Sequence, residues 1–121
     1  MVNIGSPQVI KHLLAIDANE SHFNWAPFKD GVDIHRIYGD DHKGPAAALL
    51  RYAAGAEVPV HCHSGYEHIL ILSGSQTDGD DVYEKGTLMI SAPGSQHRIA
   101  SKTGCVVLAI WQAPVDFSMA E

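Results

Sequence analysis

Residues 55–74 read GAEVPVHCHSGYEHILILSG, which is typical of a strand, a tight turn and a second strand. His61 and His63 are two residues apart. Because side chains alternate between the two faces of a strand, both imidazoles point to one face and Cys62 points to the other. Glu67 opens the returning strand beside them. The stretch therefore predicts three converging metal ligands, with Cys62 as a small buried hydrophobe.

His97 is the fourth candidate ligand, and it follows a second strand punctuated by glycine and proline. It lies on a non-adjacent strand, so only a closed sheet brings it to the other three. Three imidazoles and one carboxylate suit zinc, iron, nickel, copper or manganese, and the ligand types do not choose among these ions. Such a set leaves one or two coordination positions open in a five- or six-coordinate ion, unlike a closed structural zinc site.

The alternative is that these are surface histidines, because the chain has eight histidines and a chance H-x-H is unremarkable. The frame of Gly55 and Gly74 around the ligands favours the metal site. Four of the five other histidines have no ligand spacing and are expected to bind no metal: His12, His22, His35 and His42.

The rest of the chain predicts an all-β domain of short strands separated by turn residues. We expect an N-terminal arm over residues 1–30, with a short helix or a packed arm at Pro7–Ile16, and one barrel domain over residues 31–121. The predicted strands are Val32–Tyr38, Ala46–Ala53, Glu57–His63, Glu67–Leu72, a weak run near Gln76–Tyr83, Thr87–Ser91, Arg98–Ser101 and Cys105–Gln112.

Two of these strands, Glu67–Leu72 and Cys105–Gln112, are apolar on both faces. A half-exposed antiparallel strand would alternate apolar with polar residues. Their outer faces therefore need cover, from the N-terminal arm or from a second subunit, and we expect a homodimer.

Charge and composition limit the kinds of partner that we expect the chain to bind and the cellular location that we expect for it. The formal net charge is −6, and the eight Lys and Arg residues are scattered, which argues against a nucleic-acid or anionic membrane surface. No stretch reaches the roughly 20 apolar residues that a membrane span needs, and the N-terminus lacks the features of a secretory signal. With only two cysteines, we expect a cytoplasmic protein.

The motifs resemble those of the cupin superfamily. Gly55–Gly74 matches the first motif, G-x5-H-x-H-x3-E-x6-G, at every specified position, and Gly86–Ser101 resembles the second, G-x5-P-x-G-x2-H-x3-N. Ala92 replaces the motif's proline and Ser101 its asparagine, and neither position is a ligand in the family. The resemblance implies a jelly-roll barrel, also called a double-stranded β-helix, over roughly residues 31–112. It implies as metal ligands His61, His63, Glu67 and His97.

Within cupins, the order and spacing from His61 to Trp111-Gln112 is most similar to the ChrR-type group. That group includes the C-terminal cupin of an anti-sigma factor, in which the matching three His and one Glu bind zinc, and many stand-alone domains of unassigned activity. The anti-sigma factor has a separate N-terminal zinc domain with its own Cys and His ligands. This chain has no such cysteine cluster, so sigma-factor binding is not carried over.

An apolar lining beside one metal suits a small organic substrate. By alternation Ile69 and Ile71 share the ligand face, and Leu88 and Ile90 are expected to line the same interior. Trp111 is expected to be a core or interface aromatic residue.

Two polar residues are further pocket candidates. Tyr66 lies in the ligand turn, where it either bonds a ligand or packs at the rim. Arg51 either reaches a carboxylate substrate through its planar guanidinium or lies at an edge with its charge in solvent.

Two functions remain open. The first is a non-haem dioxygenase, because cupins with this ligand set include such enzymes; the second is a non-catalytic zinc-binding or sensing module of ChrR type. Isomerases and epimerases are a weaker third option. The chain has no G-x-S-x-G elbow and no phosphate-binding loop. Any chemistry would then depend on the metal, with Glu67 as a ligand or as a displaced general base.

Overall fold

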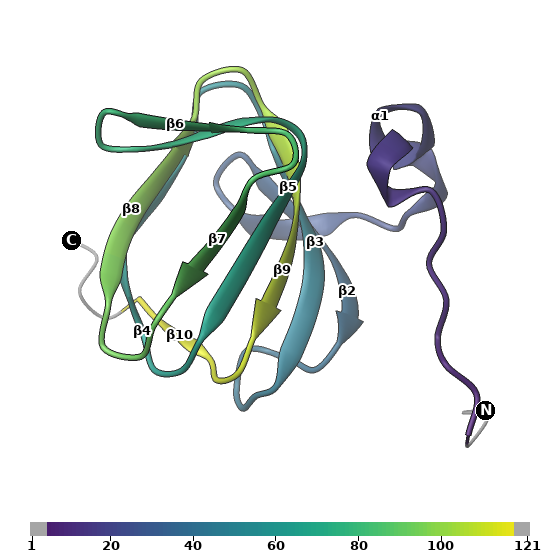
Figure 1. Ribbon diagram of the computed structural model, residues 1–121, viewed down its shortest axis with the longest axis horizontal. Coiled ribbons are helices and arrows are strands. Elements are labelled where there is room, and N and C mark those ends of the chain that lie inside the picture. Colours follow the sequence, from purple (N-terminus) through teal and green to yellow (C-terminus); the bar gives the residue numbers. More distant parts are fainter. Residues whose placement is uncertain (1–4, 118–121) are drawn as a thin grey trace.

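The structure is a computed structural model that describes residues 5–117, and these form a ten-stranded antiparallel sheet that curls into a barrel (Figure 1). The main path of paired strands runs β1-β2-β3-β9-β5-β8-β4-β10, and β6 and β7 both pair with β5. The strands are β1 (Ala26–Lys29), β2 (Val32–Tyr38), β3 (Ala46–Tyr52), β4 (Ala56–His63), β5 (Glu67–Asp78), β6 (Asp81–Glu84), β7 (Leu88–Ser91), β8 (Gln96–Ser101), β9 (Cys105–Trp111) and β10 (Val115–Asp116). The prediction of an all-β cupin-type barrel is confirmed.

Strand β5 is the corner of this barrel. Its first half pairs with β7 and β9, and its second half pairs with β6 and β8. The chain bends at Gly74, where φ is 71° and where a Cβ would collide with the carbonyl oxygen of Gly104. We expected Ser73-Gly74 to end the strand, but a residue without a Cβ lets the strand turn from one wall to the other and continue to Asp78.

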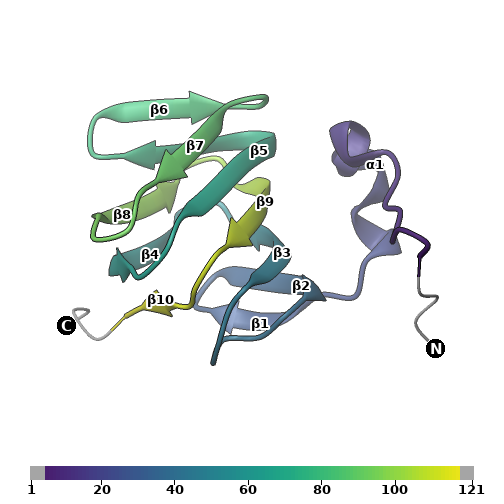
Figure 2. The same ribbon diagram turned by 60° about the horizontal axis from the view of Figure 1, so that its bottom comes forward.

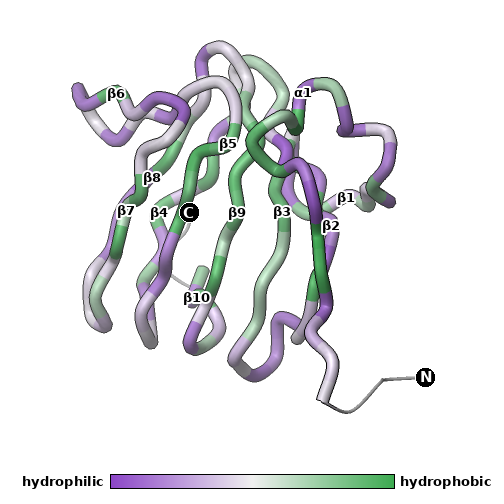
Figure 3. The backbone as a smooth tube through the Cα atoms, turned by 45° about the vertical axis from the view of Figure 1, so that its right-hand side comes forward, coloured by the Kyte–Doolittle hydropathy of each residue, from purple (hydrophilic) through white to green (hydrophobic). Residues whose placement is uncertain are grey.

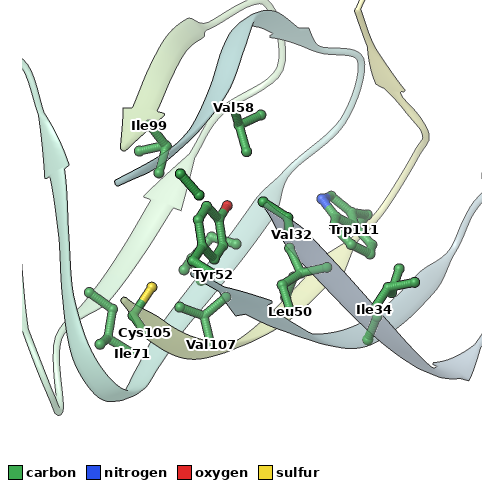
Figure 4. Close-up of a cluster of buried hydrophobic side chains, with 14 of the residues drawn as sticks. Val32, Ile34, Leu50, Tyr52, Val58, Ile71, Ile99, Cys105, Val107 and Trp111 are labelled. Atoms are coloured by element: carbon green, nitrogen blue, oxygen red, sulfur yellow. The ribbon is translucent and has the colours of Figure 1, made fainter. Parts of the chain in front are cut away.

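The inward-facing side chains form a continuous apolar interior. Figure 4 shows side chains from six strands pointing toward one another, among them Leu50 of β3, Ile71 of β5 and Val107 of β9. Ile71 and Val107 are both fully buried. Alternation along the central strands therefore directs one face into the barrel, as the sequence pattern predicts.

The outer face of the central strands is partly covered by the N-terminal segment. Leu49, Leu72 and Val106 are buried there under Ile16, and Leu13 packs against the same cluster. Figure 3 shows long hydrophobic stretches along β5 and β9, the two strands that are apolar on both faces. The arm thus provides part of the cover that the sequence requires.

The helical part of that segment begins later than expected. A 3-10 turn spans Leu13–Ala15, α1 spans Ile16–Asn19 and a second 3-10 turn spans Glu20–His22. Of the two alternatives expected at Pro7–Ile16, a short helix or a packed arm, the helix does not form over residues 7–12, which have no regular secondary structure (Figure 2). The turns form where Leu13 and Ile16 reach the sheet, because packing stabilises short helices more than propensity does.

The sheet also begins within the segment expected to be the arm. Strand β1 pairs with β2, Ala26 lying opposite Ile34. The ends of both expected segments, residues 1–4 and 118–121, lie outside the described residues. No helix formed by residues 5–117 has the length and apolar character that crossing a membrane requires. The cytoplasmic location stays a prediction.

Candidate metal centre

Two neighbouring strands and one turn bring the four candidate ligands together. His61 of β4 lies directly opposite His97 of β8, His63 ends β4 and Glu67 begins β5. One ligand atom from each of the four lies within 4.8 Å of all the others. We expected His97 to come from a non-adjacent strand, but β8 pairs with β4, so the His61–His97 contact is a direct cross-strand pair.

The three imidazoles converge with nearly perpendicular planes. The His61 and His63 ring centroids are 5.1 Å apart, and His97 lies 4.6 Å from each of them. The interplanar angles are between 79° and 87°. Three rings that meet edge to face direct their nitrogen atoms to a common point, as one ion requires.

The Nδ1 atoms are held on the side away from that point. Nδ1 of His61 donates to the carbonyl oxygen of Pro59 at 2.8 Å. Nδ1 of His63 lies 3.0 Å from Oγ of Ser95, which itself donates to the Ala92 carbonyl and so accepts from the ring. In both rings Nδ1 carries a proton and Nε2 faces the centre. Outer partners of this kind orient metal-binding histidines.

His97 has a looser outer partner. Its Nδ1 lies 3.7 Å from Oδ2 of Asp78, a distance of electrostatic attraction. The carboxylate of Asp78 favours a proton on this Nδ1, which leaves Nε2 for the centre.

Glu67 presents one oxygen to the centre, because its other oxygen is held by a tryptophan. Nε1 of Trp111 donates to Oε2 at 2.7 Å, and both side chains are buried. Oε1 lies 3.1 Å from Nε2 of His63 and 3.6 Å from Nε2 of His97. Trp111 therefore leaves Oε1 as the free ligand atom of this carboxylate.

In the absence of a metal ion, the pKa values of the four candidate ligands are set by their burial and by their contacts with one another and with Trp111. Burial opposes ionisation of Glu67, but the hydrogen bonds and charges of His63, Trp111 and His97 outweigh it and lower its pKa. Burial would lower the pKa of His63, but its bond to Glu67 outweighs this and raises it. Burial lowers the pKa of His61 and of His97. A metal ion competes with protons for these nitrogen atoms, so metal binding should depend on pH.

One buried atom indicates that the cluster of His61, His63, Glu67 and His97 fits a cation. Nε2 of His97 is shielded from solvent and has no hydrogen-bond partner in the described part of the chain. Buried polar atoms without partners are rare and need an explanation. A divalent ion bound by the three Nε2 atoms and by Oε1 of Glu67 would satisfy this atom, so the residues fit a metal.

A cavity of about 240 Å³ adjoins the cluster and has His61 and Glu67 in its wall. The space is large enough for a small organic ligand. Its remaining wall is mostly apolar, with charged side chains at Lys29, Asp40 and Asp41. The apolar lining residues are Phe28, Ala46, Leu50, Val58, Trp111, Pro114, Val115 and Phe117.

None of the six expected pocket residues lines this cavity, and four of them lie on the outer face of the barrel. Tyr66, Leu88 and Ile90 are about half exposed on the outer face. Antiparallel pairing explains this, because Ile90 lies opposite His68 and Leu88 opposite Leu70, and both partners point outward. The inward residue of β7 is Met89, opposite Ile69.

Arg51 is the fourth, and it also lies on the outer face. Its guanidinium bonds Asp33 at 2.9 Å, lies near Glu20 and stacks 4.5 Å from the ring of Trp25. It therefore ties the arm to the sheet. Ile69 and Ile71 do face the interior, on the same side of β5 as Glu67, but neither lines the cavity.

Sequence reasoning missed the residues that shape the cavity mouth. Phe117 packs 5.2 Å from the ring of His61 and follows β10, whose residues pair with Cys62 and His63. Lys29 ends β1. Both strands are too short to produce a period-2 pattern, so no sequence signal marked them.

Comparison with known proteins agrees with this geometry. The model of the ChrR cupin-like domain family matches residues 15–115. The anti-sigma-E factor ChrR of Cereibacter sphaeroides is 34% identical over 74 residues, which are 60% of this chain and 35% of that protein. The chain thus spans about a third of this curated relative.

Solved structures share the fold. ChrR in the complex with SigE from Rhodobacter sphaeroides has a TM-score of 0.64 at 27% identity, over 73% of this chain and 48% of that one. The acetylacetone dioxygenase of Acinetobacter johnsonii has a TM-score of 0.68 at 14% identity, over 95% of this chain and 83% of that one. A putative acetylacetone dioxygenase of Methylibium petroleiphilum reaches 0.73 at 12% identity, with the same coverage. At these last two identities the likeness shows the fold alone.

Proposed function

The chain belongs to the ChrR cupin-like family, as its motifs predicted, and on that premise we propose that it is a small-molecule metalloenzyme of the non-haem dioxygenase type. The observation that carries the proposal is the cavity beside the ligand cluster. A purely structural ion needs no adjoining space, whereas a catalytic ion needs an open position and room for a substrate.

The residues of the chain have separate roles in this proposal. Nε2 of each histidine and Oε1 of Glu67 hold the ion, which when bound supplies the Lewis acidity and the redox chemistry that oxygen activation requires. The apolar wall, including Leu50 and Val58, excludes water and orients the carbon skeleton of the substrate.

Glu67 has a second proposed role. Glu67 lines the cavity, so a Glu67 displaced from the ion can accept a proton from a substrate bound there. Trp111 keeps Oε2 in place during this movement. The carboxylate thus remains oriented while Oε1 changes its partner.

The fold that this chain shares with acetylacetone dioxygenases over 95% of its length is compatible with the enzyme reading, which the cavity supports. A second candidate is a non-catalytic zinc-binding or sensing module, supported by 34% identity to an anti-sigma factor. In that case a protein partner, as in the ChrR–SigE complex, replaces the small molecule. The two readings differ in the metal and in turnover.

The test is the metal content of the protein purified without added metal, followed by oxygen uptake with small diketones, thiols and aromatic diols. Iron together with uptake for at least one compound supports the dioxygenase. Tightly held zinc, with no uptake and no turnover, contradicts it and favours the sensing module. His63→Ala should lose both metal and uptake, whereas His42→Ala, at an exposed loop position, should keep both.

We also propose a homodimer that uses the outer-face hollow, defined by Pro45, Tyr66, His68, Ile90, Ile110, Trp111 and Gln112. The arm covers the neighbouring part of this face but leaves Ile90 and Ile110 exposed. Burial of such residues favours association. Light scattering should give twice the chain mass, and Ile90→Asp should give the monomer mass; a monomeric wild-type protein contradicts the proposal.

A further inference from the structure

The wall of the metal cavity contains one cation whose charge is not balanced by a carboxylate. Lys29 lines the cavity, and its Nζ lies 4.0 Å from the ring centre of Phe117 and 5.5 Å from that of Phe28. Within residues 5–117, no carboxylate lies within ion-pair distance of this amine. Aromatic faces attract a cation, but they compensate its charge less than a carboxylate does.

The two aspartates in the same wall are already engaged. Oδ1 of Asp40 accepts the backbone N–H groups of His42 and Lys43 at 2.9 and 3.2 Å. Oδ2 of Asp41 pairs with Arg36 at 2.8 Å. Because both acids have donors of their own, the group that can still gain a strong partner is the ammonium of Lys29.

Lys29 is also at a useful distance from the metal ligands. The centre of the Phe117 ring lies 4.0 Å from Nζ and 5.2 Å from the ring centre of His61, and all three side chains line the cavity. A single aromatic ring therefore separates the amine from a ligand histidine. A molecule with a chain of a few carbon atoms spans that gap.

We infer that the substrate of this site is a small anion: an apolar body with one oxygen group at the metal and a carboxylate at Lys29. This inference rests on the proposed metalloenzyme function and specifies its substrate class. The formal net charge of −6 repels dianions from the protein as a whole, so a preference for them must arise locally. Lys29 is then a residue that determines specificity.

The test compares glutarate with pentanoate, which have equal chain length and differ by one terminal carboxylate, by calorimetric titration of the zinc-loaded protein. We expect glutarate to bind about tenfold more tightly, the effect of one partly shielded ion pair. Lys29→Met should remove this preference and Lys29→Arg should keep it. Lys102→Met makes the same charge change in a residue outside the cavity wall and should have no effect.

The metal content and thermal unfolding of every sample are measured alongside. Equal affinities in the wild type, binding of neither acid, or a preference that survives in folded Lys29→Met would each overturn the substrate class while the metal site stands. If the wild-type protein retains no metal, that result contradicts the proposed function and also the substrate class that rests on it.

Discussion

Replacing Trp111 by Phe removes the indole N–H that donates to Oε2 of Glu67. The indole N–H donates to this oxygen at 2.7 Å, and the Glu67 side chain is buried, with only 5% of the residue exposed. The phenyl ring keeps most of the apolar contact with the interior. The substitution therefore isolates the hydrogen bond.

A hydrogen bond to a buried charged group contributes about 1.5 to 3 kcal/mol. We expect the metal-free variant to lose stability by about this amount in urea unfolding at neutral pH. The pKa of Glu67 should rise, because Trp111 is one of the groups that lower it. With Oε2 released, the carboxylate loses its orientation, and metal affinity should fall about 10- to 100-fold.

The assay for affinity is competition with a chromophoric chelator, with Trp25→Phe as the matched control. Nε1 of Trp25 donates to the Glu20 carbonyl at 2.9 Å and lies in the arm cluster on the outer face, outside the metal cavity. Trp25→Phe should leave metal affinity unchanged. An affinity of Trp111→Phe within twofold of wild type would refute the positioning role of the tryptophan.

Three further predictions follow from the packing, the corner and the pKa values. Leu49 is fully buried, so Leu49→Ala should leave a cavity and lower the free energy of unfolding in urea by about 2 to 5 kcal/mol. Leu14 is exposed, so Leu14→Ala should lower it by less than about 0.5 kcal/mol. Equal losses in the two variants would contradict the described core. Gly74→Ala should lower the melting temperature more than Gly79→Ala does. Both glycines have a positive φ, but only a Cβ at residue 74 would collide with a backbone oxygen, that of Gly104. Similar decreases in the two variants would contradict the role of Gly74 at the corner of the barrel. In the metal-free protein, Glu67 has a lowered pKa, so its stabilising effect is present above the ordinary glutamate pKa and disappears as pH falls through the lower value. The stability advantage over Glu67→Gln in unfolding curves should shrink over that acid range, and an advantage constant with pH would contradict the assignment.

The sequence predicted most of the strands and the four candidate ligands because both depend on local patterns. Strand β2 has the predicted bounds, Val32–Tyr38, since alternation and flanking glycines define it. Only one turn separates His61 and His63 from Glu67, so the alternation of side chains along the two strands is enough to predict that they lie together. These parts of the fold need no long-range information.

The remaining features depend on pairing that no local pattern records. His97 joins the site because β8 pairs with β4 in a particular register, and Leu88 and Ile90 face outward because β7 pairs with β5 in another. Lys29 and Phe117 come from opposite ends of the chain and meet only in the folded barrel. These cavity-lining residues, on which the proposed substrate class rests, could therefore be identified only from the structure.

The most direct test of the metal centre is a crystal structure of the protein purified as expressed, with anomalous data collected at the absorption edge of the metal that it contains. We predict one ion at about 2.1 Å from Nε2 of His61, His63 and His97. Oε1 of Glu67 should be its carboxylate ligand, and Oε2 should still accept the hydrogen bond from Trp111. An ion bound through Nδ1, an ion held elsewhere, or a site that stays empty when metal is added would contradict it.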